Sequence, residues 1–328
     1  MRNTKRTIFI TGATSFVGAN LVRRLIADKF NNVHIATREG SNKWRLTKYL
    51  SKIYEHKVDL RERVRLSKII KKISPDIIFH LATQGIYGGD HLPHKEVIET
   101  NLLGTINLID ACDCLDYSCF INTGSSSEYG KKDASMKETD VCCPDNVYGI
   151  TKNASTQYGQ LVAKAKNKPI ISLRLFSPYG PFDSRDKLIA AAIVNAIENK
   201  DLNLTNPETA RDYIFIEDVL DVYLKAIDKA ENFKGEIFNV GSGRQTKISE
   251  VIENIMQITG SKSRIKWGAY KSRAYDTQNW VANIEKTKKL LGCSPKYNLR
   301  KGLEETVNWF KTYLNSRDIS KYFYNPRE

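Results

Sequence analysis

The 328-residue sequence has no uninterrupted apolar run that approaches the roughly 18 to 20 residues needed to cross a bilayer. Residues 7–11 already form a strand-like run, and no apolar signal-peptide core comes before them. We therefore expect a cytoplasmic protein without a membrane partner. Hydrophobic residues make up 41% of the chain and charged residues 27%, a composition that excludes a disordered or collagen-like protein.

Cysteine is too scarce and too irregularly spaced to define a metal site or a disulfide scaffold. The six cysteines occur as one pair two residues apart, one adjacent pair and two single residues: Cys112 and Cys114, Cys142 and Cys143, Cys119, and Cys293. Tetrahedral zinc usually takes paired C-x-x-C units with further Cys or His ligands. We expect reduced thiols and no bound metal.

The sequence also lacks the aromatic stacking modules and other motifs of nucleic-acid-binding proteins, although its net charge is +14. Residues 38–72 contain twelve basic and only four acidic residues. Such a segment can bind nucleic acid, an acidic membrane or an anionic small ligand. Because no motif accompanies the charge, we interpret the segment as a solvated basic face and do not expect nucleic acid as a partner.

Strand and helix patterns alternate through the first half of the chain. The expected strands are residues 7–11, 33–37, a strand ending at 58–60, 77–82, 119–123 and 170–176, and the expected helices are 16–29, 61–73, 94–114 and a long helix after 148. Apolar strands separated by helices predict a Rossmann-type α/β fold, a doubly wound parallel sheet covered on both faces. We predict a nucleotide domain over residues 1–176. A smaller α+β lobe over 177–328 would return some strands and helices to it.

The first expected strand runs into a turn of small residues, TGATSFVG at 11–18, and then into a helix. This order suits a pyrophosphate, because small residues let the backbone approach closely and the helix N-terminus stabilises negative charge. Serine stands at the middle position of a Gly-x-x-Gly-x-x-Gly spacing. The residues expected to hold the dinucleotide here are Gly12, Thr14, Ser15, Phe16, Val17 and Gly18.

The second expected strand ends with Ala36, Thr37 and Arg38. An NAD-binding protein usually places Asp or Glu there, against the ribose diol. Arg38 instead offers a guanidinium that can hold a 2′-phosphate, so NADP(H) is favoured over NAD(H) as cofactor. Asp59 and Leu60 are expected to flank the adenine.

Tyr148 and Lys152 are spaced i and i+4, which places a phenol and an ammonium on one face of a helix. A free phenol titrates near 10, and a neighbouring ammonium lowers that pKa toward the range useful for proton transfer. Upstream, Ser125 follows a strand and can donate to a developing oxyanion beside the tyrosine. This ordered combination is far more specific than a Y-x-x-x-K pair alone.

The set resembles the extended short-chain dehydrogenase/reductases that act on nucleotide-diphosphate sugars. The likeness extends through residues 101–105, 174–181, 211–219, 239–243 and 290–303, with Ser177 in place of the family's asparagine. The resemblance implies further coenzyme contacts from Leu81, Ala82, Thr83, Asn101 and Thr123, together with Tyr148 and Lys152. For the substrate it implies Thr83, Ser125, Ser126, Ser127, Tyr148, Ser177, Arg211, Arg273 and Asp276. It also implies a homodimer that pairs the helices around 94–114 and 148–167.

The serine turn distinguishes among members of that family. Dehydratases need carboxylates directly after the Ser or Thr that touches the sugar, to take a C5 proton and expel the C6 hydroxyl. Here Ser126 and Ser127 stand at those positions, and Glu128 is offset by one residue and should point elsewhere. A C4 ketoreductase or a 4-epimerase remains.

Arg38 favours the reductase, because an epimerase commonly retains NAD through its cycle. Residues 80–83 and 267–273 are also similar to 4-reductases of the CDP-abequose and CDP-paratose synthase type. We predict NADPH-dependent reduction of the C4 keto group of a nucleotide-linked 4-keto-6-deoxy or 3,6-dideoxy sugar. The alternatives are a 4-epimerase with tightly held NAD(P) and, more remotely, a non-catalytic relative that binds a coenzyme or RNA.

Overall fold

The computed structural model describes residues 5–85, 93–270 and 277–314. Its centre is a seven-stranded sheet in the order β11-β6-β5-β4-β1-β2-β3, and every pair of neighbouring strands is parallel. The strands are β1 (Ile8–Thr11), β2 (Val33–Thr37), β3 (Tyr54–Lys57), β4 (Ile77–His80), β5 (Cys119–Ser125), β6 (Ile170–Leu175) and β11 (Ile237–Val240). The predicted Rossmann-type fold class is confirmed.

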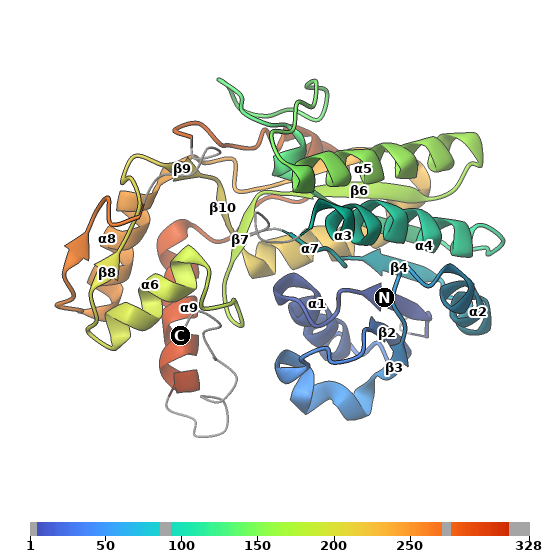
Figure 1. Cartoon of the computed structure of the whole chain (residues 1–328), viewed down its shortest axis with the longest axis horizontal. Helices are drawn as coiled ribbons and strands as arrows, with labels where there is room; N and C mark the ends of the chain where they lie inside the picture. Colours follow the sequence, from blue (N-terminus) through green and yellow to red (C-terminus); the bar gives the residue numbers. More distant parts are fainter. Residues whose placement is uncertain (1–4, 86–92, 271–276, 315–328) are drawn as a thin grey trace.

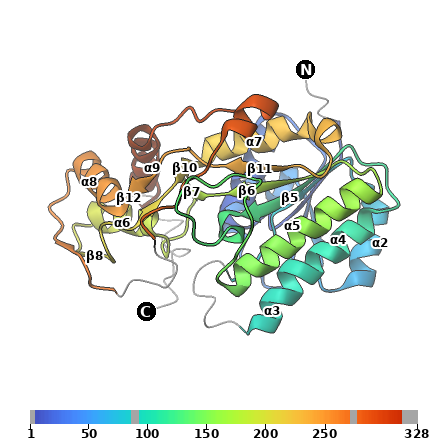
Figure 2. The ribbon, with the colours of Figure 1, turned by 90° about the horizontal axis from the view of Figure 1, so that it is seen from above.

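Helices cover both faces of this sheet, as Figures 1 and 2 show. One face carries α2 (Arg63–Ile73), α4 (Gly104–Cys112) and α5 (Val147–Ala165), and the other carries α1 (Phe16–Ala27) and α7 (Ile216–Ile227). Alternate strand residues divide between the two layers: Phe9 and Phe120 belong to the core under α2, α4 and α5, and Ile10 and Ile121 to the opposite core. Because both faces of the inner strands are buried, β1 and β4 read as almost continuous apolar runs, whereas the edge strand β3 is polar and partly exposed.

The direction in which strands are added to the sheet changes at one point, between β1 and β4. The chain moves from β1 outward to β2 and β3, then returns to β4 on the other side of β1. Connections after β1 and β4 therefore diverge, which opens a crevice at the carboxyl ends of the strands. This is the place where such sheets bind ligands.

The second half of the chain builds a smaller lobe beside this crevice. It contains α6 (Leu188–Ile197), α8 (Ile248–Thr259) and α9 (Leu299–Leu314), with the short strand pairs β8 (Leu202–Asn203) with β13 (Ile265–Lys266) and β9 (Ala210–Arg211) with β12 (Thr246–Lys247). A further pair, β7 (Ser177–Tyr179) with β10 (Tyr213–Phe215), follows directly on β6. The expected boundary at residue 176 falls between β6 and β7, and β11 returns from the second half to the main sheet.

Some element boundaries differ from the expected ones. The sequence analysis did not predict a 3-10 helix, η1 (Trp44–Lys52), of whose residues only Leu46 is fully buried. The third strand ends at Lys57, before residues 58–60. The expected helix over 94–114 is formed by α3 (His94–Ile98), a π-helical turn, η3 (Glu99–Leu103), and α4. Within the described residues, no helix is long and apolar enough to span a membrane.

Candidate active site

A cleft of about 1440 Å³ follows the carboxyl ends of the strands, from the start of α1 across to α6 and β10. It brings together most of the residues selected from the sequence. Those that line it are Ser15, Phe16, Val17, Leu81, Thr83, Thr123, Ser125, Ser126, Ser127, Tyr148, Lys152, Ser177 and Arg211. A single hollow therefore joins the dinucleotide loop, the serine turn and the Tyr148–Lys152 helix.

The remaining selected residues do not line this cleft. Gly12, Thr14, Gly18, Leu60, Ala82 and Asn101 are absent from its lining, as are Arg38, which follows β2, and Asp59, which follows β3. Asn101 is buried and ties the loop after β4: its carboxamide oxygen accepts from the backbone N–H of Gln84 at 2.8 Å, and its nitrogen donates to Thr151. Asn101 thus shapes the wall behind Thr83. Arg273 and Asp276 are outside the described residues.

Two glycines make the tight turn between β1 and α1. Gly12 has a φ of +69°, and a Cβ there would lie 2.5 Å from the backbone nitrogen of Ala82. A Cβ on Gly18 would lie 2.2 Å from the carbonyl oxygen of Gly12. The Ser15 side chain caps α1 by accepting the backbone N–H of Gly18 at 3.2 Å. The close packing and the helix N-terminus at the cleft fit a dinucleotide pyrophosphate.

Arg45 is a cleft residue that the sequence analysis missed. It lies on η1, its Nε donates to the carbonyl of Phe182 at 2.7 Å, and it contacts the carbonyl of Thr14 at 3.4 Å. Burial lowers the pKa of its guanidinium, and Asp183 is the first of the nearby acids that oppose this shift. Since Arg45 joins segments more than a hundred residues apart, no local pattern could have identified it.

A carboxylate reaches the end of β2 from the neighbouring strand, although β2 was expected to have none there. The strand itself carries no carboxylate there, but Glu55 on β3 reaches across and accepts from the Thr37 hydroxyl at 2.6 Å. Lys43 holds Glu55 at 2.8 Å, and these contacts lower the pKa of the Glu55 carboxyl. The exposed Arg38 guanidinium makes no hydrogen bond within the described part of the chain.

Asp59 is held differently from the expectation that it would contact adenine. Arg61 binds both of its carboxylate oxygens, at 3.0 and 2.8 Å, and its backbone N–H adds a third bond at 2.9 Å. These bonds, with a smaller contribution from Arg38, lower the pKa of the Asp59 carboxyl. The carboxylate is therefore already occupied by a neighbour.

Tyr148 and Lys152 occupy the first turns of α5, which Asn146 begins by accepting the backbone N–H of Gly149 at 2.8 Å. A Cβ on Gly149 would lie 2.4 Å from the carbonyl of Ser127, so glycine lets the serine turn pack directly on the helix. Lys152 is only 2% exposed. Burial lowers the pKa of its ammonium to about 8, and Glu128 opposes the shift.

The serine turn follows β5 as a short 3-10 helix, η4 (Ser126–Glu128). The Ser125 hydroxyl oxygen accepts the backbone N–H of Ser127 at 3.1 Å, which leaves its hydrogen available for another acceptor. The Ser126 hydroxyl accepts the indole N–H of Trp280 at 3.0 Å. Trp280 is a second residue missed from sequence, being 154 positions away along the chain.

Glu128 points away from the cleft that the three serines line, as its offset predicted. Its carboxylate is fully buried and makes an ion pair of 2.7 Å with Arg174 on β6. Behind the turn, Tyr223 on α7 shares a hydrogen bond of 2.6 Å with the Thr123 hydroxyl. Neither contact could be read from local sequence.

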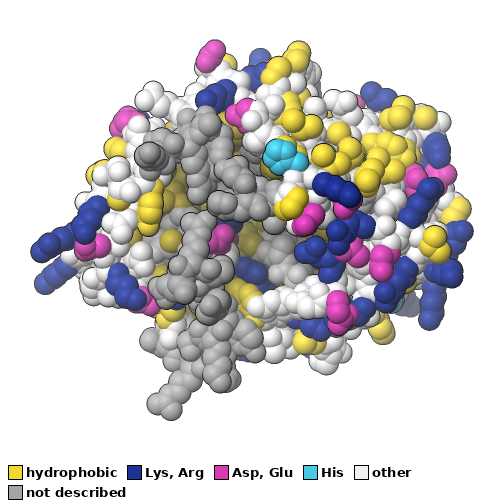
Figure 3. Space-filling view, in the orientation of Figure 1, with side chains coloured by type: hydrophobic (Ala, Val, Ile, Leu, Met, Phe, Trp, Pro, Cys, Tyr) yellow, Lys and Arg dark blue, Asp and Glu magenta, His cyan; other side chains and the backbone are white. Residues whose placement is uncertain are grey.

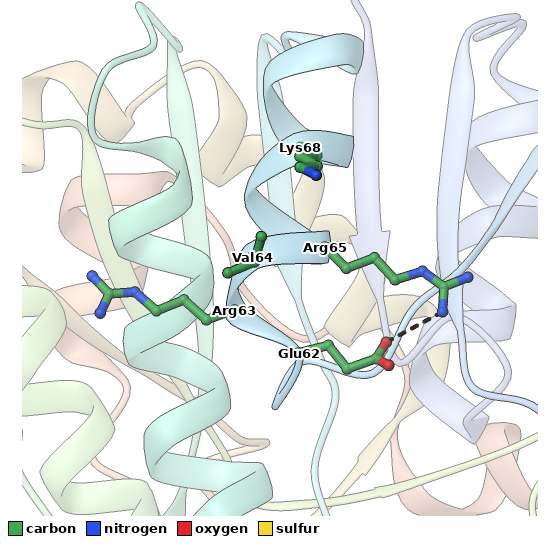
Figure 4. Close-up of a pocket in the computed structure, with 5 residues that line it drawn as sticks. All are labelled: Glu62, Arg63, Val64, Arg65 and Lys68. Carbon is green, nitrogen blue, oxygen red and sulfur yellow. Dashed lines mark hydrogen bonds and ion pairs between the residues drawn. The ribbon is translucent and has the colours of Figure 1, made fainter.

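The basic segment does not gather at the cleft. Figure 4 shows that Arg63 and Arg65 extend in different directions from the start of α2, with Arg65 directed toward Glu62. Arg63 pairs with Asp110 at 3.5 Å and Arg65 with Glu62 at 3.5 Å. Among the described residues, no group of three or more His, Cys, Asp or Glu side chains could hold a metal ion.

The lowered pKa of Lys152 predicts a specific dependence of stability on pH. Between about 8 and the ordinary value of 10.5, the unfolded chain holds a proton on Lys152 that the folded protein has released. In this window the Lys152 contribution to the free energy of unfolding should rise by roughly 1.4 kcal/mol per pH unit. Lys152→Met should remove this rise. Urea unfolding of both proteins from pH 6 to 10.5 measures it, and parallel curves would contradict the prediction.

Comparison with known proteins places these features in a family. The model of the NAD dependent epimerase/dehydratase family matches residues 8–241. CDP-abequose synthase of Salmonella muenchen is 27% identical over 311 residues, covering 94% of this chain and 99% of that protein. A structure of UDP-glucuronic acid 4-epimerase from Bacillus cereus, with UDP-glucuronic acid and NAD, has 26% identity and a TM-score of 0.82, covering 93% and 99% of the two chains.

A second solved structure shows the same fold. UDP-glucose 4-epimerase from Thermotoga maritima, with UDP-glucose, has a TM-score of 0.86 at 24% identity, covering 94% of this chain and 99% of that one. The family match includes every strand of the central sheet, from β1 to β11, and the Tyr148–Lys152 helix. The chain belongs to the NAD dependent epimerase/dehydratase family.

Proposed function

We propose that the protein is an NADPH-dependent reductase of the C4 keto group in a nucleotide-diphosphate 4-keto-6-deoxy or 3,6-dideoxy sugar. The observation that carries this proposal is the serine turn opposite Tyr148 in the cleft. Ser125, Ser126 and Ser127 all line the cleft, whereas the neighbouring carboxylate of Glu128 is committed to Arg174. Without a carboxylate on this turn facing the sugar, hydride and proton exchange at one carbon is favoured over dehydration.

When bound, the coenzyme would supply the hydride that reduces the C4 carbon of the sugar. Tyr148 donates its phenolic proton to the C4 oxygen, which becomes the hydroxyl of the product. Lys152 stabilises the resulting phenolate through its positive charge. The Ser125 hydroxyl, whose lone pair already accepts the Ser127 N–H, donates its hydrogen to the same sugar oxygen. A solvent proton then restores the phenol.

We propose that residues 1–176 hold the coenzyme and that residues 177–328 mainly hold the nucleotide sugar. Arg211 lines the cleft on β9, and its guanidinium lies 5.3 Å from the centre of the Trp280 ring. This places a cation suited to a diphosphate next to the aromatic ring that fixes Ser126. CDP-abequose synthase, among the relatives, supports a deoxysugar substrate.

A 4-epimerase is the second candidate, because both solved structures compared above are described as 4-epimerases of UDP-sugars. The two reactions differ in their coenzyme balance. A reductase consumes one NADPH for each product molecule, whereas an epimerase returns the hydride to its substrate.

Nucleotide-linked 4-keto-6-deoxy sugars should therefore oxidise NADPH in the presence of the enzyme, with one product alcohol per NADPH. Tyr148→Phe should lower kcat by roughly 10²- to 10⁴-fold, the usual contribution of a general acid, while coenzyme affinity stays within a few-fold. Absorbance of NADPH and chromatography of the sugars measure both quantities. Inversion at C4 without net NADPH oxidation would identify the epimerase instead, and full activity of Tyr148→Phe would refute the assignment of the acid.

The coenzyme preference should depend on Arg38. Arg38→Ala should raise the KM for NADPH roughly 10- to 100-fold, because a charge-assisted bond to the 2′-phosphate is lost, and should leave the KM for NADH nearly unchanged. Arg65→Ala is the matched control, since it removes an exposed arginine from α2. An equal effect on both coenzymes, or wild-type preference for NADH, would argue for NAD(H).

We further propose that the protein is a homodimer joined through α3, η3 and α5. Ile98, Leu103, Ile150 and Leu161 remain 40 to 62% exposed there. Figure 3 shows yellow side chains gathered over this part of the molecule.

The double variant Leu103→Glu with Leu161→Glu should therefore be monomeric by light scattering. Val64→Glu, at a 69% exposed position on α2, should remain dimeric. A monomeric wild type would refute the proposal.

A further inference from the structure

The buried carboxylate of Glu128 connects the two halves of the proton-transfer site. Its Oε1 accepts the backbone N–H of Ser125 at 2.8 Å and the hydroxyl of Thr156 at 3.1 Å. Thr156 lies one turn beyond Lys152 on the same face of α5. One oxygen therefore fixes both the serine that faces the sugar and the helix that carries the lysine.

The surroundings leave this carboxylate no room to move. Its second oxygen accepts from Arg174 Nε at 2.7 Å, and a Cβ on Gly124 would lie 2.5 Å from Oε1. The Arg174 guanidinium in turn lies 4.5 Å from the centre of the Tyr129 ring and contacts the Cys142 sulfur at 3.2 Å. The negative end of the Glu128–Arg174 pair is thus directed toward α5, and its positive end toward β6 and Tyr129.

Charged and titratable groups from several helices and strands surround Lys152. Glu128 lies on η4 and Tyr148 on α5 itself. His80 lies on β4, where Thr11 and Thr105 bond its two ring nitrogens at 2.7 and 2.8 Å. Burial, with a smaller contribution from Lys152, lowers the pKa of His80 to about 3, so this ring is neutral. Arg174 stands behind Glu128, and Tyr223 on α7 faces Tyr148.

From this arrangement we propose that Glu128 is a positioning residue of the active site, which keeps Lys152 a cation and orients Ser125. Glu128 supplies the anion that opposes desolvation of the Lys152 ammonium. Without it, Lys152 would lose its proton at lower pH and would no longer stabilise the Tyr148 phenolate. The inference rests on the proposed proton-transfer pair, and it applies equally to a reductase and to an epimerase.

Glu128→Gln keeps the side-chain shape and removes the charge. Its effect should appear as a change in the way NADPH affinity and kcat depend on pH. The alkaline midpoint above which NADPH affinity and kcat decline should move down by roughly one pH unit, the size of shift that a nearby opposite charge produces. At low pH the kcat of the variant should approach that of the wild type more closely than at pH 9. Fluorescence titration with NADPH or NADH across the pH range gives the midpoint without any sugar substrate.

Two companion variants separate the charge from the geometry. Thr156→Val removes one hydrogen bond but leaves the carboxylate charged, so kcat should fall several-fold while the midpoint stays in place. Asp218→Asn is the matched control, a carboxylate on α7 that accepts the backbone N–H groups of Lys296 and Tyr297. It should lose stability without any change of midpoint.

The partner left behind in Glu128→Gln is the buried Arg174, and an unpaired buried charge is strongly destabilising. If the single variant does not fold, Glu128→Gln with Arg174→Met removes both charges and should give the same lowered midpoint. An unchanged midpoint in the folded variant would overturn the inference, because Lys152 would then not depend on Glu128.

A coenzyme-free measurement keeps this test apart from the proposed function. Urea unfolding of Glu128→Gln and of the double variant Glu128→Gln with Lys152→Met gives the pH at which the Lys152 contribution to stability begins to rise. This pH should be lower than the one obtained by comparing the wild type with Lys152→Met. If no sugar is turned over but the Lys152 contribution to stability begins to rise at a lower pH in Glu128→Gln, only the proposed reaction is refuted. If that pH is the same as in the wild type, the role of Glu128 is refuted.

Discussion

Lys152 lines the cleft but is only 2% exposed, so its ammonium is largely removed from water and depends on the surrounding protein to keep its proton. Burial lowers its pKa to about 8, and Glu128 opposes that shift. Desolvation favours a neutral amine, whereas the proposed proton transfer by Tyr148 needs a cation nearby. The proposed mechanism therefore depends on the packing of the serine turn on α5 and on the ion pair behind it.

The parallel sheet explains how distant segments reach that point. All seven strands end at the same edge, so the loops after β1, β4, β5 and β6 meet there, although β1 ends at Thr11 and β6 only at Leu175. The second lobe then supplies Arg211 and Trp280 from still later in the chain. Trp280 donates to the Ser126 hydroxyl and Glu128 accepts from the Ser125 backbone N–H, so two different residues hold the two neighbouring serines.

The charged side chains near the ends of β2 and β3 are exposed or paired at the surface, unlike the buried ones around Lys152. The Arg38 guanidinium is exposed and makes no hydrogen bond to the described residues, whereas Glu55 and Asp59 nearby are bound to Lys43 and Arg61. The acids that could have repelled a 2′-phosphate are thus neutralised by cations of their own. Among the other basic residues between 38 and 72, Lys57 on β3 and Arg63 and Arg65 on α2 form ion pairs with nearby carboxylates, whereas Arg45 on η1 lines the cleft.

The sequence alone determined the alternation of elements, the dinucleotide turn and the spacing of Tyr148 and Lys152, because each depends on residues within a few positions of one another. It also predicted that Glu128 would point away from the cleft lined by the serines, since the offset is a local property of the turn. Tertiary structure alone decided that Arg174, Thr156 and Trp280 would complete the site, and that Glu55 would reach the end of β2. These contacts join side chains that are 18 to 154 positions apart, and no periodicity records which of many polar residues will meet once the chain is folded.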